Sequence, residues 1–427
     1  MPALDHDAVD VIGADDAGWR AQQRAVAAGA FAETPMPDSG EEIWRYIDLD
    51  FDLDDYAPVP GAGTPLENDP LGGIWDTTLS ASLIDGHWIG EDQDGAGVTL
   101  ASLHGSSKVK PALIESVLAE SGLGEVSDRF ALAATAFGAD GAFVHVPTGT
   151  VAPGVIYLDV QAAQPGSVTF PRIVAAVDDG AEAAIVVHLR SRPDDDLVVV
   201  PQIAAAVGTN ARLAVTVVQN WGYATRSLAN VNAAIGRDGT LRFAEVGLGG
   251  RLSRLHLDMR MQGAGSAANV VGAYFGEAAQ TLDYRYFMRH SGTNTRSDMF
   301  LKGAVEDEAR SVFTGMIRIE ETGQKTEAFQ TNRNLILSEG ASAQSVPNLE
   351  ILANDVKCGH GSTVGPLDAA QRYYLMTRGL GEQRADQLQV HGFFEEALVK
   401  LPQRELVAPV RKWINDKFVT AQKAGRV

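Results

Sequence analysis

The strongest constraint on the fold is a glycine that recurs every 27–31 residues through the middle of the chain. Successive glycines lie 28, 28, 27, 29 and 31 residues apart, at Gly180, Gly208, Gly236, Gly263, Gly292 and Gly323. Short strand-like runs follow them, such as AIVVHL, LAVTVV and LRFAEVGL. No helical pattern separates these runs. A period of this size without helices predicts a solenoid of stacked β-coils, in which each coil hydrogen-bonds to its neighbours.

Two β-sandwiches would also account for a segment this rich in strands. Sandwiches join many of their strands through tight hairpins, for which Asn-Gly pairs are the strongest short signal. Such pairs do not mark the turns of this segment. The pattern therefore favours the solenoid, in which inward-facing Ala, Val, Leu and Ile side chains fill the interior.

Sequence patterns divide the chain into three predicted domains. Residues 1–140 are predicted to form an N-terminal helical domain with a loop rich in Pro, Gly and Asp at residues 50–73. Residues 141–361 are predicted to form the β-solenoid core, and residues 362–427 a small C-terminal helical domain. Hydrophobic periodicity places the N-terminal helices near residues 15–33, 111–121 and 127–137.

The C-terminal domain carries clear helix signals. Asp368 and Gln371 have the spacing of an N-cap and its capping-box partner. An apolar stripe then follows helical spacing, and a last helix is predicted at residues 405–424. The stripe consists of Val390, Phe393, Phe394, Ala397, Leu398 and Leu401. It needs a cover, which either the β-rich body or another protein can supply.

Charge and cysteine content narrow the function. The formal net charge is −20 at pH 7, so the chain has no basic surplus to neutralise nucleic-acid phosphates or an anionic membrane. The acidic first residues lack the pattern of a signal peptide, and no apolar run is long enough to cross a bilayer. A single cysteine cannot form an internal disulfide, which fits a reducing compartment. We therefore expect a cytoplasmic protein without nucleic-acid or membrane partners.

Most recognisable enzyme motifs are absent from the sequence. The P-loop pattern G-x-x-x-x-G-K-[ST] does not occur, so the chain itself is not expected to be a P-loop ATPase. The patterns H-E-x-x-H, C-x-x-C and G-x-S-x-G do not occur either. A Ser-His-Asp triad stays open, because its members need not be close in sequence.

The motif that carries chemistry is the stretch DVKCGHGSTVG, which holds the only cysteine of the chain. On a strand, residues two apart face the same side, so the Cys358 thiol and the His360 imidazole would project together, about 6–7 Å apart at Cα. Both groups are good ligands for iron or zinc. Gly359 and Gly361 leave the backbone open to a partner or an ion. Lys357 adds positive charge that would favour the thiolate, although its side chain points to the opposite face of the strand.

A simpler interpretation is a buried Cys358 in the core beside a hydrogen-bonded His360. Two ligands also cannot hold an iron–sulfur cluster alone, because such a cluster normally takes four. A cluster at this place would have to be completed by another chain. The residues alone leave both interpretations open.

The same region resembles the SufB/SufD family of iron–sulfur cluster assembly scaffolds. The resemblance is carried by AFQTNRNLILSEGA, by the run P-x-L-E-I, by D-V-K-C-x-H-G and by the helix sequence YYLMTRGL. It covers residues 143–401 and is specific over residues 311–398. The WRYID segment, the chain length and the absence of the further cysteines of SufB resemble the SufD branch. SufD homologues often read C-S-H-G-A-T where this chain reads CGHGST, and both candidate ligands are kept.

The resemblance implies a mainly β protein, with a right-handed parallel β-helix flanked by N- and C-terminal α-helical domains. It also implies a non-catalytic subunit that pairs with SufB and, through its C-terminal helices, with the ABC-type ATPase SufC. A transient iron–sulfur cluster is then expected at the SufB–SufD interface, with His360 and Cys358 as iron ligands from this chain. We expect His360 to point out of the solenoid toward SufB.

The resemblance also raises reduced flavin as a ligand of the assembled complex, whereas nucleotide is expected on SufC and not on this chain. Two other functions stay open. One is a SufB-like subunit that accepts sulfur through Cys358, and the other is an independent β-helix enzyme that acts on carbohydrates. A homodimer of this chain without SufB is also left open.

Overall fold

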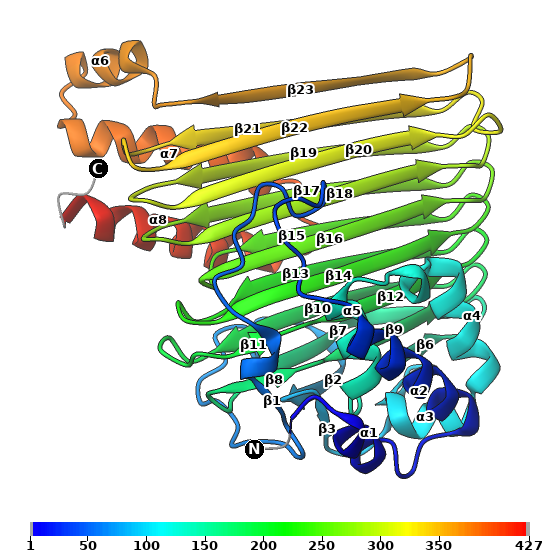
Figure 1. Ribbon diagram of the computed structural model, residues 1–427. Coiled ribbons are helices and arrows are strands. Elements are labelled where there is room, and N and C mark those ends of the chain that lie inside the picture. Colours follow the sequence, from blue (N-terminus) through cyan, green and yellow to red (C-terminus); the bar gives the residue numbers. More distant parts are fainter. Residues whose placement is uncertain (1–2, 424–427) are drawn as a thin grey trace.

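The computed structural model describes residues 3–423, and its body is a parallel β-solenoid between helices near the two ends of the chain (Figure 1). Two long sheets form this body, a thirteen-stranded sheet A and a ten-stranded sheet B. From β12 onward, successive strands alternate between the sheets, and each pairs in parallel with the strand of the coil before it. The predicted solenoid is therefore confirmed, and the β-sandwich alternative is wrong.

The two sheets run from the open last coil to the first coil near the N-terminal helices. In sheet A the order is β22 (Ser342–Ile351), β20 (Arg310–Ile319), β18 (Thr281–His290), β16 (Leu252–Met261), β14 (Arg226–Ile235), β12 (Gln202–Val207), β9 (Arg172–Val177), β6 (Ala142–Val146), β5 (Val98–Ser102) and β4 (Gln93–Gly95), with β1 (Ala57–Pro58), β8 (Ser167–Thr169) and β11 (Val198–Val199) beside this path. In sheet B the order is β23 (Lys357–Gly365), β21 (Glu327–Ile336), β19 (Arg296–Val305), β17 (Ala267–Gly276), β15 (Thr240–Gly247), β13 (Arg212–Asn220), β10 (Glu182–Ser191), β7 (Val151–Ala162), β2 (Thr77–Ile84) and β3 (His87–Ile89).

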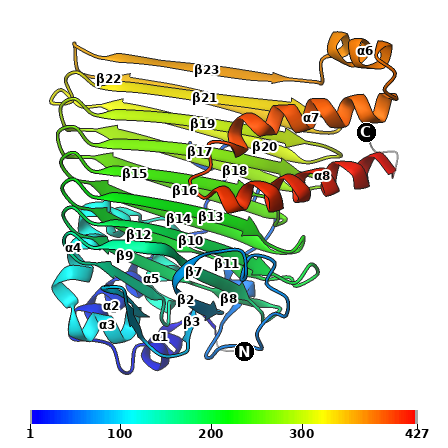
Figure 2. The same ribbon diagram turned by 180° about the vertical axis from the view of Figure 1, so that it is seen from behind.

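Helices pack around the first coils and along the outer face of sheet B (Figure 2). The N-terminal helices are α1 (His6–Ile12), α2 (Gly18–Glu33), α3 (Leu103–Val109), α4 (Pro111–Ser121) and α5 (Arg129–Phe137). The C-terminal helices are α6 (Ala369–Thr377), α7 (Glu382–Leu398) and α8 (Val407–Lys423). Short 3-10 turns are η1 (Leu53–Asp55), η2 (Leu123–Glu125) and η3 (Arg404–Leu406). None of the described helices combines the length and apolar composition needed to cross a membrane.

Three of the recurring glycines, Gly236, Gly263 and Gly292, each stack on the recurring glycine of the preceding coil at one corner of the solenoid. A Cβ added to Gly263 would lie 2.2 Å from the carbonyl carbon of Gly236, and one added to Gly292 would lie 2.4 Å from the carbonyl oxygen of Gly263. Distances this short are not tolerated between a side chain and backbone, so a larger residue at Gly263 or Gly292 would force the two turns apart. The sequence period thus reflects close contact between successive backbones.

The solenoid interior holds the main core. Inward-facing Val, Leu, Ile, Met and aromatic side chains from both sheets pack in one continuous cluster from the first coils to the last. Burial of this apolar surface stabilises every coil against its neighbours. The first and last coils each have a neighbour on one side only, and the N-terminal helices and loops pack around the first coils (Figures 1 and 2).

The apolar stripe of helix α7 is covered by the solenoid itself. Val390, Phe394 and Leu398 are buried against the outer face of sheet B, together with side chains of α8 (Figure 2). Lys302 of β19, only 1% exposed, pairs with Glu396 at 2.7 Å beneath this helix. Of the two covers that the stripe could have had, the β-rich body is therefore the one that the structure shows.

Predicted helices near residues 15–33, 111–121 and 127–137 correspond to α2, α4 and α5. Asp368 caps α6 as predicted, since its side chain accepts hydrogen bonds from the backbone N–H groups of Ala370 and Gln371. The last predicted helix corresponds to α8, and its predicted end at residue 424 lies outside the described residues.

Strands β1 to β5 were not predicted, because residues 1–140 showed only helix and loop patterns. Their physical basis is long-range pairing, as when β2 pairs in parallel with β7 some seventy residues later in the chain. At the other end, β23 continues to Gly365, past the predicted limit of the core at residue 361. The division into domains at residues 140/141 and 361/362 stays a prediction.

Replacing Gly263 by Ala should destabilise the solenoid by about 1–3 kcal/mol, because the new Cβ would press on the backbone of the preceding coil. The measurement is the thermal midpoint of the far-UV circular dichroism signal. The matched control is Gly29→Ala in helix α2, where nothing lies within 4 Å of an added Cβ. Helix propensity should leave that midpoint unchanged or raise it. An unchanged midpoint for Gly263→Ala would show that the corner relaxes and that stacking does not require glycine.

Candidate functional site: an open solenoid end

The last coil of the solenoid is open. Strand β22 ends sheet A and β23 ends sheet B, and within residues 3–423 no strand pairs with their outer edges (Figure 1). Most residues of β23 are exposed, whereas the strands of the preceding coils are largely buried. An edge strand presents unpaired backbone N–H and C=O groups, which are a template for another chain. This end is therefore the place where the fold itself is incomplete.

Cys358 and His360 both lie on β23 and face the solenoid axis. In the parallel register Cys358 is directly above Ala328 of β21, and His360 is directly above Gln330. Ala328 and Gln330 are buried in the interior, at 0% and 2% exposure. Side chains in register on adjacent strands share a face, so thiol and imidazole project to the same, inward side. The sequence prediction that they lie side by side on one strand agrees with this register.

The Cys358 thiol is a partly buried group at the edge of the core. It packs against the interior cluster and forms no disulfide. Burial raises the pKa of this thiol. Lys357, which faces the outer side, pairs with Glu327 at 3.1 Å and gives the thiol no charge partner. Lys357 therefore faces away from the thiol as expected, and its charge is engaged by Glu327 rather than favouring the thiolate.

His360 is exposed although it faces inward. The expectation that it points out of the solenoid is wrong in register, because its row continues the interior row of the coil below. The ring is reached by solvent because no further coil covers it. An added Cβ on Gly361 would meet nothing within 4 Å, and one on Gly359 would meet only the Phe329 ring at 3.7 Å. The backbone around His360 is therefore open to a partner, as predicted.

Cys358 and His360 could supply only part of the ligand set of a metal-containing cargo. A thiol and an imidazole are suitable ligands for iron, and the open end leaves room for further ligands from outside the chain. Four ligands normally hold an iron–sulfur cluster, so two from this chain require others from a partner or from small molecules. Such a cluster would be cargo that forms and leaves, and not a group on which the fold depends.

A second cluster of ligand-type side chains was not predicted from the sequence. Ligand atoms of Asp69, Asp159 and His188 lie within 4.8 Å of one another on the outer face of sheet B. His188 Nδ1 lies 3.0 Å from Asp69, and the Tyr157 hydroxyl donates to Asp69 at 2.6 Å. Asp69 stands far from the others in sequence, so only the coil-by-coil folding of the chain could reveal this cluster.

This cluster is a structural anchor. Arg190 already forms a two-pronged ion pair with Asp159, both contacts at 2.7 Å, so a metal would have to displace a guanidinium. Burial alone would raise the pKa of Asp69, but hydrogen bonds from His188 and Tyr157 outweigh burial and hold it well below the ordinary 3.8. These contacts fasten the loop that carries Asp69 onto β7 and β10.

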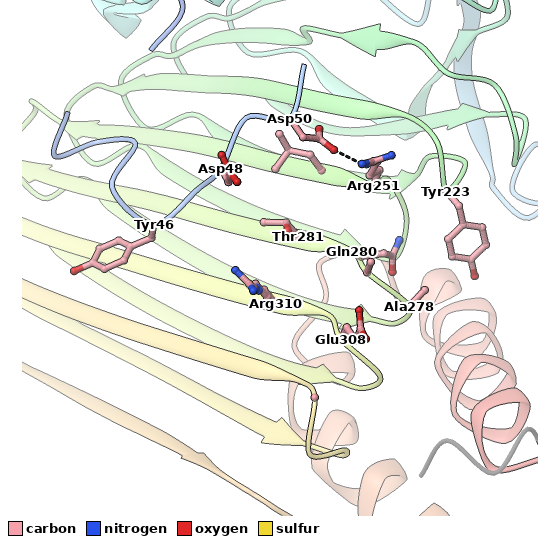
Figure 3. Close-up of a pocket in the computed structure, with 13 residues that line it drawn as sticks. Tyr46, Asp48, Asp50, Tyr223, Arg251, Ala278, Gln280, Thr281, Glu308 and Arg310 are labelled. Atoms are coloured by element: carbon pink, nitrogen blue, oxygen red, sulfur yellow. Dashed lines mark hydrogen bonds and ion pairs between the residues drawn. The ribbon is translucent and has the colours of Figure 1, made fainter. Parts of the chain in front are cut away.

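A groove of about 740 Å³ lies between residues 46–50 and the beginnings of strands β16, β18 and β20 (Figure 3). Arg251 pairs with Asp50 across it, and Glu308 and Arg310 line the other side. Its charges are of both signs, and neither Cys358 nor His360 belongs to its lining. The groove is therefore separate from the open end and shows no preference for one class of ligand.

Fold and site together define a class of protein: a parallel β-solenoid that presents a thiol and an imidazole, two side chains of metal-ligand type, at an open end. Within that class, the chain belongs to the family described as SUF system FeS cluster assembly, SufBD core domain. The model of this family matches residues 160–393, which is more than half of the 427 residues. The family resemblance stated from the sequence motifs is therefore confirmed.

Named relatives agree with this family. The chain is 33% identical over 244 residues to an iron–sulfur cluster assembly SufBD family protein of Mycobacterium tuberculosis, covering 55% of this chain and 60% of the relative. It is 29% identical over 218 residues to the iron–sulfur cluster assembly protein SufD of Escherichia coli, covering 51% and 52%. For SufD of Bacillus subtilis the identity is 27% over 281 residues, covering 64% of each. The matches thus span about half to two thirds of the relatives' length.

Replacing Asp69 by Asn should lower the free energy of unfolding by about 1–2 kcal/mol at pH 7, through loss of hydrogen bonds to a charged acceptor. The folded pKa of Asp69 is depressed, so its stabilising contribution is complete above the ordinary value of 3.8 and is lost as pH falls toward the folded pKa. Urea unfolding of parent and variant at pH 7 and at pH 3 should show the difference shrinking in acid. A difference that is the same at both pH values would contradict the assigned role of the carboxylate.

Proposed function

We propose that this chain is a SufD-type subunit of an iron–sulfur cluster assembly scaffold. Its open end pairs with the β-helix of a SufB-type subunit, and His360, with Cys358, faces the nascent cluster at that junction. The SufC-type ATPase supplies the energy, so this chain is a non-catalytic scaffold. The named SufD relatives support the branch, and the family model supports the assembly role.

One observation carries the proposal: the Cys358–His360 pair stands on the inward row of an uncapped coil. A residue that only packed the core would lie on an inner coil, where this row is buried. A ligand pair meant to act alone would be surrounded by further donors of the same chain. An incomplete ligand set next to an unpaired strand edge is what we expect of a chain that functions together with a second β-solenoid subunit.

The SufB-like alternative, in which Cys358 accepts sulfur, is less well supported. Sulfur acceptance needs a thiolate, and burial raises the pKa of Cys358 with no cationic partner to offset it. No observation among the described residues favours the carbohydrate-active alternative. Reduced flavin in the complex, a homodimer without SufB, and a cytoplasmic location stay predictions.

The surface proposed for the ATPase subunit is helix α6. No residue of α6 is buried, and Tyr373, Tyr374 and Met376 are 71%, 54% and 42% exposed. Helices α7 and α8 are fastened to sheet B and turn their apolar sides inward. Clustered exposed aromatic and Met side chains are typical of protein interfaces. We therefore assign docking of the SufC-type subunit to α6 and not to the stripe of α7.

Replacing His360 by Ala should leave the complex with SufB- and SufC-type subunits assembled and hydrolysing ATP, because the exposed ring contributes little packing. Cluster formation should fail, since an iron ligand is missing. The measurement is cluster absorbance of the purified complex after addition of iron and a sulfur donor. Cys358→Ala is the comparison variant and should be milder, because the partner is proposed to supply the sulfur-accepting thiol.

If the His360→Ala complex formed clusters at the level of the parent, the proposal that His360 is a ligand of the nascent cluster would be wrong. If that variant instead failed to assemble, His360 would have to be understood as a residue of the subunit interface.

Replacing Tyr373 and Tyr374 together by Ala should weaken binding of the SufC-type subunit by about tenfold or more, because two exposed aromatic anchors are lost. Binding is measured by titration of the purified subunit. The control is Tyr46→Ala, which removes an exposed Tyr remote from α6. Thermal midpoints of both variants should match the parent. Unchanged affinity of the double variant would place the docking surface elsewhere.

A further inference from the structure

The inward row of strand β21, directly beneath the open end, is largely polar. On strand β19 the inward row contains Met299 and Leu301, which are fully buried. In the same register, β21 places Gln330 above Met299 and Asn332 above Leu301. Polar side chains in a dry interior lower stability unless each finds a partner. The hydrogen-bond partners of Gln330 and Asn332, which lie one coil below His360, therefore need to be identified.

The asparagines of this row satisfy one another. Asn334 donates to Asn332 at 2.6 Å, and the Tyr274 hydroxyl donates to Asn334 at 2.5 Å. Asn332 in turn donates to Tyr274 at 3.3 Å. Gly303 makes room for this arrangement, because a Cβ there would lie 1.9 Å from the Tyr274 ring. This part of the row is a closed hydrogen-bond network with a structural role.

Gln330 differs from its neighbours. It is 2% exposed, and its Nε2 donates a long hydrogen bond of 3.4 Å to the backbone carbonyl of Asn348. Its Oε1 is buried and has no hydrogen-bond partner. Gly315 of β20 leaves space for that oxygen, since a Cβ there would lie 2.2 Å from it. An unpaired buried carbonyl costs about 1–3 kcal/mol, so Oε1 is an acceptor that awaits a donor.

His360 is the residue that the register places directly above Gln330. The two residues are paired partners on adjacent strands, which lie about 4.8 Å apart, and both side chains face inward. That separation is within the combined reach of a glutamine and an imidazole. The His360 ring is exposed and makes no hydrogen bond with the described residues. Because no further coil covers the ring, the imidazole is free to turn inward along the row that it shares with Gln330, whose Oε1 lies over Gly315.

We infer that Gln330 is the positioning residue of His360: its Oε1 accepts a hydrogen bond from one ring N–H and leaves the other ring nitrogen free for iron. Histidines that ligate metals nearly always donate their second nitrogen to a carbonyl or carboxylate, which fixes the tautomer and the ring direction. The inference rests on the proposed function, in which His360 is the ligand. It gives the FQTNRN motif a role beyond the fold.

The tautomer of His360 provides a test that needs no cluster. The full-length chain, labelled with ¹⁵N on its nine histidines, is studied by long-range proton–nitrogen NMR at a pH where imidazole is neutral. The His360 signals are identified by their loss in His360→Ala. The parent should show one tautomer, and Gln330→Met should shift His360 toward the mixture of free imidazole. Gln330→Glu keeps an acceptor oxygen and should keep the single tautomer.

Metal affinity provides the second readout. Titration of the full-length chain with Co²⁺ should show an affinity about tenfold or more weaker in Gln330→Met than in the parent, the usual effect of removing such a partner. His360→Ala gives the background level. The matched control is Gln344→Met, the same change at an exposed, outward position of β22, which should leave the affinity unchanged. Thermal midpoints show whether each variant is folded.

The outcomes separate this inference from the proposed function. If His360 has the same tautomer in the parent and in Gln330→Met, the positioning role is overturned, while His360 can still be a ligand. If His360→Ala binds Co²⁺ as the parent does, the ligand role itself fails, and the positioning role fails with it. A tautomer and a Co²⁺ affinity that both depend on Gln330, with a thermal midpoint no lower than that of the parent, would establish the inference.

Discussion

The structure depends on the hydrogen-bonded stacking of one backbone coil directly on the next. Parallel pairing keeps each residue in register with its counterpart one coil away, and the glycines at the corner let the turns approach closely enough for that pairing. Because the register persists through the solenoid, inward rows remain inward from coil to coil. The same constraint that builds the core therefore also aligns Gln330 beneath His360 and Ala328 beneath Cys358.

Stacking has an unavoidable consequence at its last coil, where no further backbone is available. Strands β22 and β23 keep unpaired edges, and an interior row emerges into solvent. A protein that functions alone would gain stability by capping this end, as the N-terminal elements pack around the first coils. The proposed scaffold role explains why the end is left open, since a second subunit can complete both the sheets and the ligand set. Helix α6 offers a separate exposed surface at the edge of the molecule (Figure 1).

Much of this fold could be predicted from the sequence, since glycine spacing and strand-like runs are local signals of the coil period. The helices α2, α4, α5 and α8 were likewise visible as periodic patterns. Strands β1 to β5 were missed because their pairing partners lie far along the chain. The motif around Cys358 pointed to the two candidate ligands but not to the side of the strand that they face, because that side depends on the register with β21. The contact of His188 with Asp69 joins residues 119 apart, and only the folded coils bring them together.

The central claim is that the open end is completed by a partner subunit of similar shape. Hydrogen–deuterium exchange of the chain, alone and mixed with a SufB-type subunit, tests this claim most directly, because unpaired edge amides exchange quickly and paired ones slowly. The account predicts that residues 342–351 and 357–365 gain protection on mixing, while the outer strands of the first coils do not. Unchanged exchange in these two strands, with protection gained elsewhere, would contradict it.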